Sequence, residues 1–94
     1  MKVTVRLPGA LRELAGGARA LEVEVAGPAT IRTLLDTLGT GWPAIERRIR
    51  NETGVMRQHV NVFVGETNIR DLGGQDAPLA DGDEVHVIPA ISGG

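Results

Sequence analysis

The sequence predicts an α+β roll in which one sheet packs on one principal helix. Strands are indicated because apolar and polar residues alternate along several short segments, as in a sheet with one buried face. The helix is indicated by apolar residues spaced three and four apart between the second and third of these segments. The length of 94 residues fits a single domain that buries roughly two-thirds of its unfolded surface.

The first two predicted strands, at residues 2–7 and 20–25, form a hairpin-like pair with a loop of moderate length. Each strand places apolar residues on one side and charged or polar residues on the other. Between them, Leu11 and Leu14 predict a single helical turn that ends at the glycine pair beginning with Gly16.

The principal helix begins after Thr30, which is a good N-cap residue. Its buried face is predicted to consist of four residues at positions i, i+3, i+4 and i+7: Ile31, Leu34, Leu35 and Leu38. Gly39 is the predicted C-cap. A second, short helix is predicted from Pro43 to about Arg50, with two isoleucines on one face.

The rest of the chain reads as short strands joined by turns and irregular segments. In order, these are a loop at 51–58, a strand at 59–64, a short strand at 68–70, an irregular segment at 71–79, a turn at 81–83, a last strand at 84–88 and a flexible tail at 89–94. The Asp81-Gly82-Asp83 sequence is interpreted as a turn, because a calcium loop needs more oxygen ligands at a longer spacing.

Composition excludes several kinds of function. Ten basic and twelve acidic residues give a net charge of −2, so the chain has no long-range attraction for nucleic acid or an anionic membrane. The absence of cysteine removes disulfides, thiolate metal sites and a cysteine nucleophile. No segment is apolar enough for a transmembrane helix, and the first residues lack the apolar centre of a signal peptide. We therefore expect a cytoplasmic protein with no metal, nucleic-acid or membrane partner.

The basic residues and histidines are interpreted mainly as structural or solvent-facing. Arg47, Arg48, Arg50 and Arg57 form a basic cluster that predicts a solvated helix face or, alternatively, a docking patch for an acidic partner. The two histidines, at 59 and 86, have no serine or cysteine beside them in sequence, which is weak support for catalysis.

The last two residues, Gly93 and Gly94, are the sharpest functional signal. One interpretation is an ordinary frayed terminus. The other is a reactive end, because glycine lacks a Cβ and a Gly-Gly segment is slim enough to thread a narrow enzyme channel. In that case the terminal carboxylate of Gly94 is the reacting group, and the folded part is the handle that partner proteins recognise.

The predicted element order, the segment Asp81-Gly82-Asp83-Glu84-Val85 and the end Ile88-Pro89-Ala90-Ile91-Ser92-Gly93-Gly94 resemble the MoaD/ThiS family of ubiquitin-like sulfur carrier proteins. Within that family the sequence looks most similar to the CysO type, through residues 59–64 followed by 68–70 and the glycine pair at 73–74. The resemblance covers essentially the whole chain. It implies a single β-grasp domain over residues 1–94, with a mixed sheet of four to five strands packed on one main helix.

The resemblance also implies a mechanism. An E1-like adenylyltransferase and sulfurtransferase would use ATP to adenylate the Gly94 carboxylate, and a sulfur donor would convert it to a thiocarboxylate. A PLP-dependent cysteine synthase or a molybdopterin synthase large subunit would then receive the sulfur, with a metalloprotease as a further partner in the cysteine pathway. The carrier itself would bind no cofactor. Four residues are candidates for partner contact, from strand phase and their place near the tail: Phe63, Pro89, Ile91 and Ser92.

Three functions remain open from the sequence. The favoured one is a sulfur carrier for cysteine biosynthesis, with molybdopterin and then thiamin biosynthesis as alternatives. The second is a ubiquitin-like modifier, for which the single lysine, Lys2, argues against chains linked through the protein itself. The third is a non-covalent binding module whose glycine tail is incidental.

Overall fold

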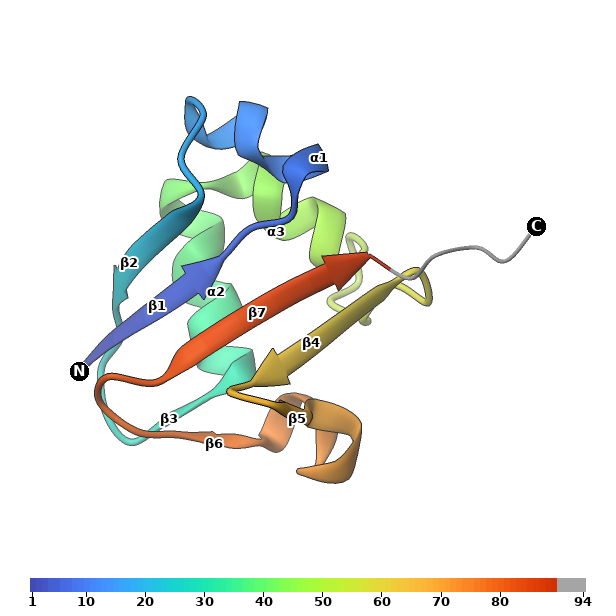
Figure 1. Ribbon diagram of the computed structural model, residues 1–94. Helices are drawn as coiled ribbons and strands as arrows, with labels where there is room; N and C mark the ends of the chain where they lie inside the picture. The colour runs from blue at the N-terminus through green and yellow to red at the C-terminus, as the bar shows by residue number, and fades with distance from the viewer. Residues whose placement is uncertain (90–94) are drawn as a thin grey trace.

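The computed structural model describes residues 1–89. Within them, helices cover one face of a sheet and leave the other face open (Figure 1). The elements in chain order are β1 (Lys2–Arg6), α1 (Gly9–Arg12), the 3-10 helix η1 (Glu13–Ala15), β2 (Ala20–Glu24), β3 (Ala29–Thr30), α2 (Ile31–Gly41), α3 (Pro43–Ile49), β4 (Val60–Val64), β5 (Thr67–Asn68), the 3-10 helices η2 (Ile69–Asp71) and η3 (Gly74–Asp76), β6 (Pro78–Leu79) and β7 (Glu84–Pro89).

The main sheet has the strand order β2-β1-β7-β4-β5. β1 pairs antiparallel with β2, as the hairpin-like pattern predicted, and it pairs in parallel with β7. β4 pairs antiparallel with both β7 and β5. The predicted α+β fold, with a mixed sheet of four to five strands on one main helix, is therefore confirmed. β1 and β7 lie side by side in the middle of the main sheet (Figure 1).

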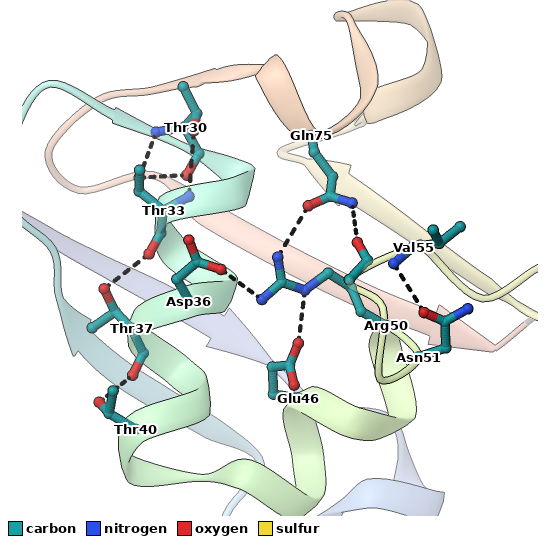
Figure 2. Close-up of polar contacts among 11 residues, drawn as sticks. Thr30, Thr33, Asp36, Thr37, Thr40, Glu46, Arg50, Asn51, Val55 and Gln75 are labelled. Atoms are coloured by element: carbon teal, nitrogen blue, oxygen red, sulfur yellow. Dashed lines mark hydrogen bonds and ion pairs between the residues drawn. The ribbon is translucent and has the colours of Figure 1, made fainter.

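The core lies between this sheet and α2. The four predicted residues of the helix face are at most 1% exposed, and Val3, Val5, Val85 and Val87 meet them from the central strands. Thr30 caps α2 as predicted: its Oγ1 accepts a hydrogen bond from the Thr33 N–H, while the Thr30 N–H donates to Thr33 Oγ1 at 2.8 Å (Figure 2). This reciprocal pair satisfies two backbone donors that the first turn would otherwise leave without partners.

The predicted end of α2 at Gly39 is wrong. The helix continues to Gly41, and Trp42 is the C-cap, with its N–H donating to the Leu38 carbonyl. The stop comes from Pro43, because the residue before a proline is sterically excluded from helical backbone angles. Trp42 accordingly has φ −134° and ψ 62°, and α3 starts directly after it.

The predicted helical turn through Leu11 and Leu14 is present and ends at Gly16. Leu11 is buried, whereas Leu14 is 36% exposed and Ala15 takes the second core position. The segment begins as α-helix in α1 and tightens to a 3-10 turn in η1. A residue four positions after Leu11 then returns to the core side, as helical spacing allows.

Two short strands, β3 and β6, are not predicted from the sequence. The predicted strand at 68–70 is instead β5, which ends at Asn68, followed by η2. The segment 71–79, predicted as irregular, contains η3 and β6, and β6 pairs with β3 in a second, two-stranded sheet. In β4, Val62 is buried while Val60 and Val64 are half-buried, so the predicted inward side is only partly covered.

Arg50 is not part of a solvated basic face. Its side chain is buried among acceptors from three elements: Nε donates to Glu46 Oε1 at 2.7 Å, Nη2 to Asp36 Oδ1 at 2.8 Å and Nη1 to Gln75 Oε1 at 3.1 Å (Figure 2). Gln75 in turn donates to the Gly54 carbonyl. A guanidinium offers five donors in a fixed fork, which suits several acceptors at once. Arg50 therefore ties α2, α3 and η3 together.

The last strand is one residue longer than predicted. Pro89 pairs with Val60 as the final residue of β7, so it belongs to the sheet and not to the tail. Among residues 1–89, none of the helices has the length and hydropathy that a bilayer crossing requires.

Candidate functional site

The open face of the sheet is the first part of the candidate site. Strand register places one row of side chains across it, because Arg6 of β1 and Phe63 of β4 both lie beside His86 of β7, and Phe63 also lies beside Asn68 of β5. Alternation points these side chains away from the helices, since Val85 and Val87 point into the core. The face thus carries a half-buried aromatic ring between a histidine and an amide.

The row continues toward the end of β7 with an apolar residue that the sequence analysis did not select. Ile88 is 46% exposed and lies opposite Asn61, next to the position of Phe63 on the same face. Pro89 follows and is also exposed. The signal was available in the sequence, because Ile88 occupies the polar phase of its strand. An apolar side chain left in that phase is a candidate for partner contact.

Of the predicted partner-contact residues, the structure describes Phe63 and Pro89, and both lie at accessible positions on β4 and β7. The other two, Ile91 and Ser92, lie outside the described residues, as do the predicted reactive glycines, Gly93 and Gly94. The assignment of all six residues to the site stays a prediction.

An ion pair between Arg6 of β1 and Glu84 of β7 lies at the β1 end of this row of side chains. Arg6 Nε donates to Glu84 Oε1 at 2.7 Å, and His86 Nε2 lies 3.6 Å from the same oxygen. The hydrogen bond and the charge of Arg6 lower the pKa of Glu84 below its usual value of 4.5, and the same contact raises the pKa of Arg6. Glu84 therefore remains ionised at neutral pH and holds Arg6 against the sheet.

Two shallow hollows flank the end of β7, one toward α3 and one toward β1. The hollow toward α3 is lined by Pro8, Ala10, Leu11, Arg48, His59, Val60, Val87 and Pro89. The hollow toward β1 is lined by Arg6, Leu7, Pro8, Arg12, His86, Val87, Ile88 and Pro89. The position from which residues 90–94 continue the chain is therefore bordered by apolar surface and by basic side chains.

The predicted turn before β7 is confirmed. Gly82 has a φ of +87°, which an L side chain rarely adopts, and Asp81 and Asp83 both accept hydrogen bonds from the backbone. Asp81 Oδ1 accepts from the Lys2 N–H and Asp83 Oδ2 from the Ala80 N–H. Across residues 1–89, His, Asp and Glu side chains nowhere gather in a group of three that could hold a metal ion.

Comparison with known proteins identifies the family to which the chain belongs. The sequence profile of the ThiS family matches residues 5–94. The chain belongs to the ThiS family. The resemblance inferred from the segment before β7 and the glycine end is thereby confirmed, and this ThiS-family chain shares the ubiquitin-like β-grasp fold of its structural neighbours.

Individual relatives carry different names at similar distances. The sulfur carrier protein CysO of Mycobacterium tuberculosis is 31% identical over 96 residues, covering all of both chains. Small archaeal modifier protein 1 of Haloferax volcanii is 35% identical over 88 residues, covering 89% of this chain and 91% of the relative. The molybdopterin synthase sulfur carrier subunit of Mycobacterium tuberculosis is 32% identical, covering 100% of this chain and 99% of the relative.

Among solved structures, a chain of the Amycolatopsis orientalis BexX/CysO complex superposes with a TM-score of 0.83 at 33% identity, covering 98% of this chain and 99% of that one. The relatives are small carriers or ubiquitin-like proteins and not enzymes. This ThiS-family chain is therefore a sulfur carrier of the MoaD/ThiS/CysO type and not itself an enzyme. The three relatives differ in role at 31–35% identity, so identity alone does not separate the pathways.

Proposed function

We propose that this chain carries sulfur for cysteine biosynthesis as a thiocarboxylate on Gly94. The observation that supports the proposal most is the whole-length alignment with CysO, together with a family match that runs to residue 94. The exposed position of Pro89 at the end of β7 supports it as well, because the chain continues from there to Gly93 and Gly94. Two glycines without a Cβ are slim enough to enter a narrow active site.

The chemistry needs activation, since a carboxylate is a poor acyl electrophile. In the first step the Gly94 carboxylate attacks the α-phosphorus of ATP on an E1-like enzyme, which gives the acyl-adenylate and releases pyrophosphate. In the second step a sulfide donor attacks the acyl carbon, and AMP leaves with the bonding electrons. The carrier contributes recognition, and the ATP and any metal or PLP belong to the partner enzymes.

The open sheet face is the proposed docking surface for those enzymes. Phe63 and Ile88 supply apolar contact area on that face, Pro89 adds exposed apolar area at the end of β7, and Ile91 and Ser92 are proposed to extend the contact. Interface cores favour aromatic and aliphatic anchors of this kind over charged residues. The crystallised BexX/CysO complex supports a second protein as the partner, because this chain superposes on one chain of that complex.

Two other functions remain as candidates, each favoured by one relative. Molybdopterin biosynthesis is favoured by the identity to the molybdopterin synthase subunit, with a molybdopterin synthase large subunit as the acceptor. Protein modification is favoured by the identity to the archaeal modifier. In that case the activated Gly94 forms an amide with a lysine of another protein, and Lys2 is this chain's only lysine.

The test supplies the thiocarboxylated chain separately to each acceptor. We expect cysteine to form with a PLP-dependent cysteine synthase, O-phosphoserine and a metalloprotease that trims the joined product. Mixing the same carrier with a molybdopterin synthase large subunit and its precursor should give no molybdopterin. The control is unmodified carrier with free sulfide at equal concentration. Molybdopterin formation without cysteine formation would contradict the proposed pathway, and lysine conjugates formed without either product would favour the modifier.

A further inference from the structure

The two hollows at the end of β7 share a charge pattern. Arg48 and His59 line the hollow toward α3, while Arg6, Arg12 and His86 line the hollow toward β1. Neither hollow has an aspartate or glutamate among its lining residues within the described chain. This basic surface contrasts with the whole chain, whose net charge is −2.

The positive charge there is only partly neutralised. Arg6 is already paired with Glu84. Arg12 uses its Nε to donate to the Leu7 carbonyl at 3.2 Å, which fixes the side chain but leaves the charge unpaired. Arg48 is exposed, and among residues 1–89 neither Arg12 nor Arg48 has a carboxylate within ion-pair distance. The two guanidiniums therefore stand on either side of the β7 end with donors available.

The remaining arginines of the basic cluster do not share this position. Arg50 is buried with its three acceptors, and Arg57 Nε donates to the Arg47 carbonyl at 2.7 Å. Arg48 is thus the member of the cluster that reaches the β7 end, where the topology brings it together with Arg12 from a segment far away in sequence. α1 follows β1 and therefore lies at the same end of the sheet as the end of β7 (Figure 1).

We propose that Arg12 and Arg48 form a basic rim that guides the tail into partner enzymes whose channel entrance carries carboxylates. The inference rests on the proposed function, because it assigns a partner surface to the same tail. Opposite charges around a docking site raise the encounter rate and fix the orientation of approach. An arginine on each side of the β7 end lets acidic side chains at a channel mouth contact the carrier before residues 90–94 enter.

The test measures thiocarboxylation of the chain by an E1-like activating enzyme of the MoaD/ThiS type, with ATP and sulfide, as a function of carrier concentration. Arg48→Glu should lower kcat/KM about tenfold at about 50 mM NaCl, through KM and not kcat, because steering acts on encounter. The loss should shrink to less than about twofold at about 0.5 M NaCl, where charges are screened within a few ångströms. The double variant Arg12→Gln, Arg48→Gln should lose less kcat/KM than Arg48→Glu does, and its loss should also shrink as the salt concentration rises.

The matched control is Arg70→Glu, an equal charge reversal at an exposed arginine in η2 that lines neither of the two hollows. It should stay within about twofold of wild type at both salt concentrations. Equal behaviour of Arg48→Glu and Arg70→Glu, or a gain for Arg48→Glu, overturns the rim while leaving the carrier function intact. Tight binding of a duplex oligonucleotide that Arg48→Glu abolishes assigns the rim to nucleic acid and also overturns it. Failure of wild type itself to gain sulfur from an active enzyme overturns the proposed function and the rim with it.

Discussion

Replacing Arg50 with methionine should destabilise the fold by about 2–3 kcal/mol. The substitution keeps most of the side-chain length and removes every donor. Burial opposes the charged form of Arg50, but hydrogen bonds to Asp36 and Glu46 outweigh it and raise the pKa of the guanidinium. Arg50 is therefore charged at every pH at which the protein folds. Its replacement leaves the acceptor oxygens of Asp36, Glu46 and Gln75 without this donor.

The magnitude follows from the exposure of those acceptors. The Glu46 side chain is only 13% exposed, so without Arg50 it is left as a largely buried carboxylate. The Asp36 side chain is 62% exposed and regains water, which limits its share of the loss. Gln75 keeps its bond to the Gly54 carbonyl. A complete buried pair would cost about 3–5 kcal/mol to break, and the exposure of Asp36 lowers that figure here.

The assay is urea unfolding followed by circular dichroism, with Arg48→Met as the matched control. Arg48 is exposed in the same helix region, so its replacement should change the free energy of unfolding by less than about 0.5 kcal/mol. Adding Glu46→Leu to Arg50→Met should recover about 1 kcal/mol or more, because removing both partners leaves no buried charge. An Arg50→Met variant as stable as Arg48→Met would refute the reasoning, as would a double variant less stable than Arg50→Met alone.

Three further perturbations test other parts of the account. Thr30→Ala should cost about 1 kcal/mol in urea unfolding through loss of the α2 cap, and Thr30→Ser should restore most of it; an unchanged midpoint for Thr30→Ala would contradict the capping role. Wild type should lose the contribution of the Arg6–Glu84 pair as the pH falls below about 4.5, because the lowered pKa of Glu84 stabilises the fold only while the carboxylate is ionised. Glu84→Gln should therefore show a flatter stability curve than wild type in that acid range. Ile88→Asp should slow sulfur transfer while leaving thermal stability unchanged, since Ile88 is 46% exposed, and equal rates would remove it from the docking surface.

The fold was predictable wherever a periodic pattern runs over several residues. The central strands and α2 have that pattern, and their boundaries agree with the structure to within one or two residues. β3 and β6 have two residues each, which is too short for periodicity, and their partners lie far apart in sequence. The sequence predicts that α2 ends at Gly39, because glycine is a common C-cap, whereas the steric effect of Pro43 ends the helix at Gly41.

The candidate site was predictable in part. The turn before β7 was identifiable from local residues alone, whereas the role of the glycine end stays a prediction. Arg50 could not be separated from Arg47 and Arg48 by sequence, because its acceptors Asp36 and Gln75 lie 14 and 25 positions away. The proposed rim could not be predicted from sequence either, because the fold brings Arg12 and Arg48 to the β7 end from segments far apart in the chain.

Intact-mass spectrometry tests the central claim most directly. Wild type and a variant lacking Gly94 are incubated with ATP, an E1-like activating enzyme of this family and sulfide. The account predicts that wild type gains the mass of one oxygen-to-sulfur exchange and that the shortened variant gains none. An unchanged mass for wild type, with an enzyme that is active on its own carrier, would contradict it. An equal gain in the shortened variant would show that the sulfur is not carried on Gly94.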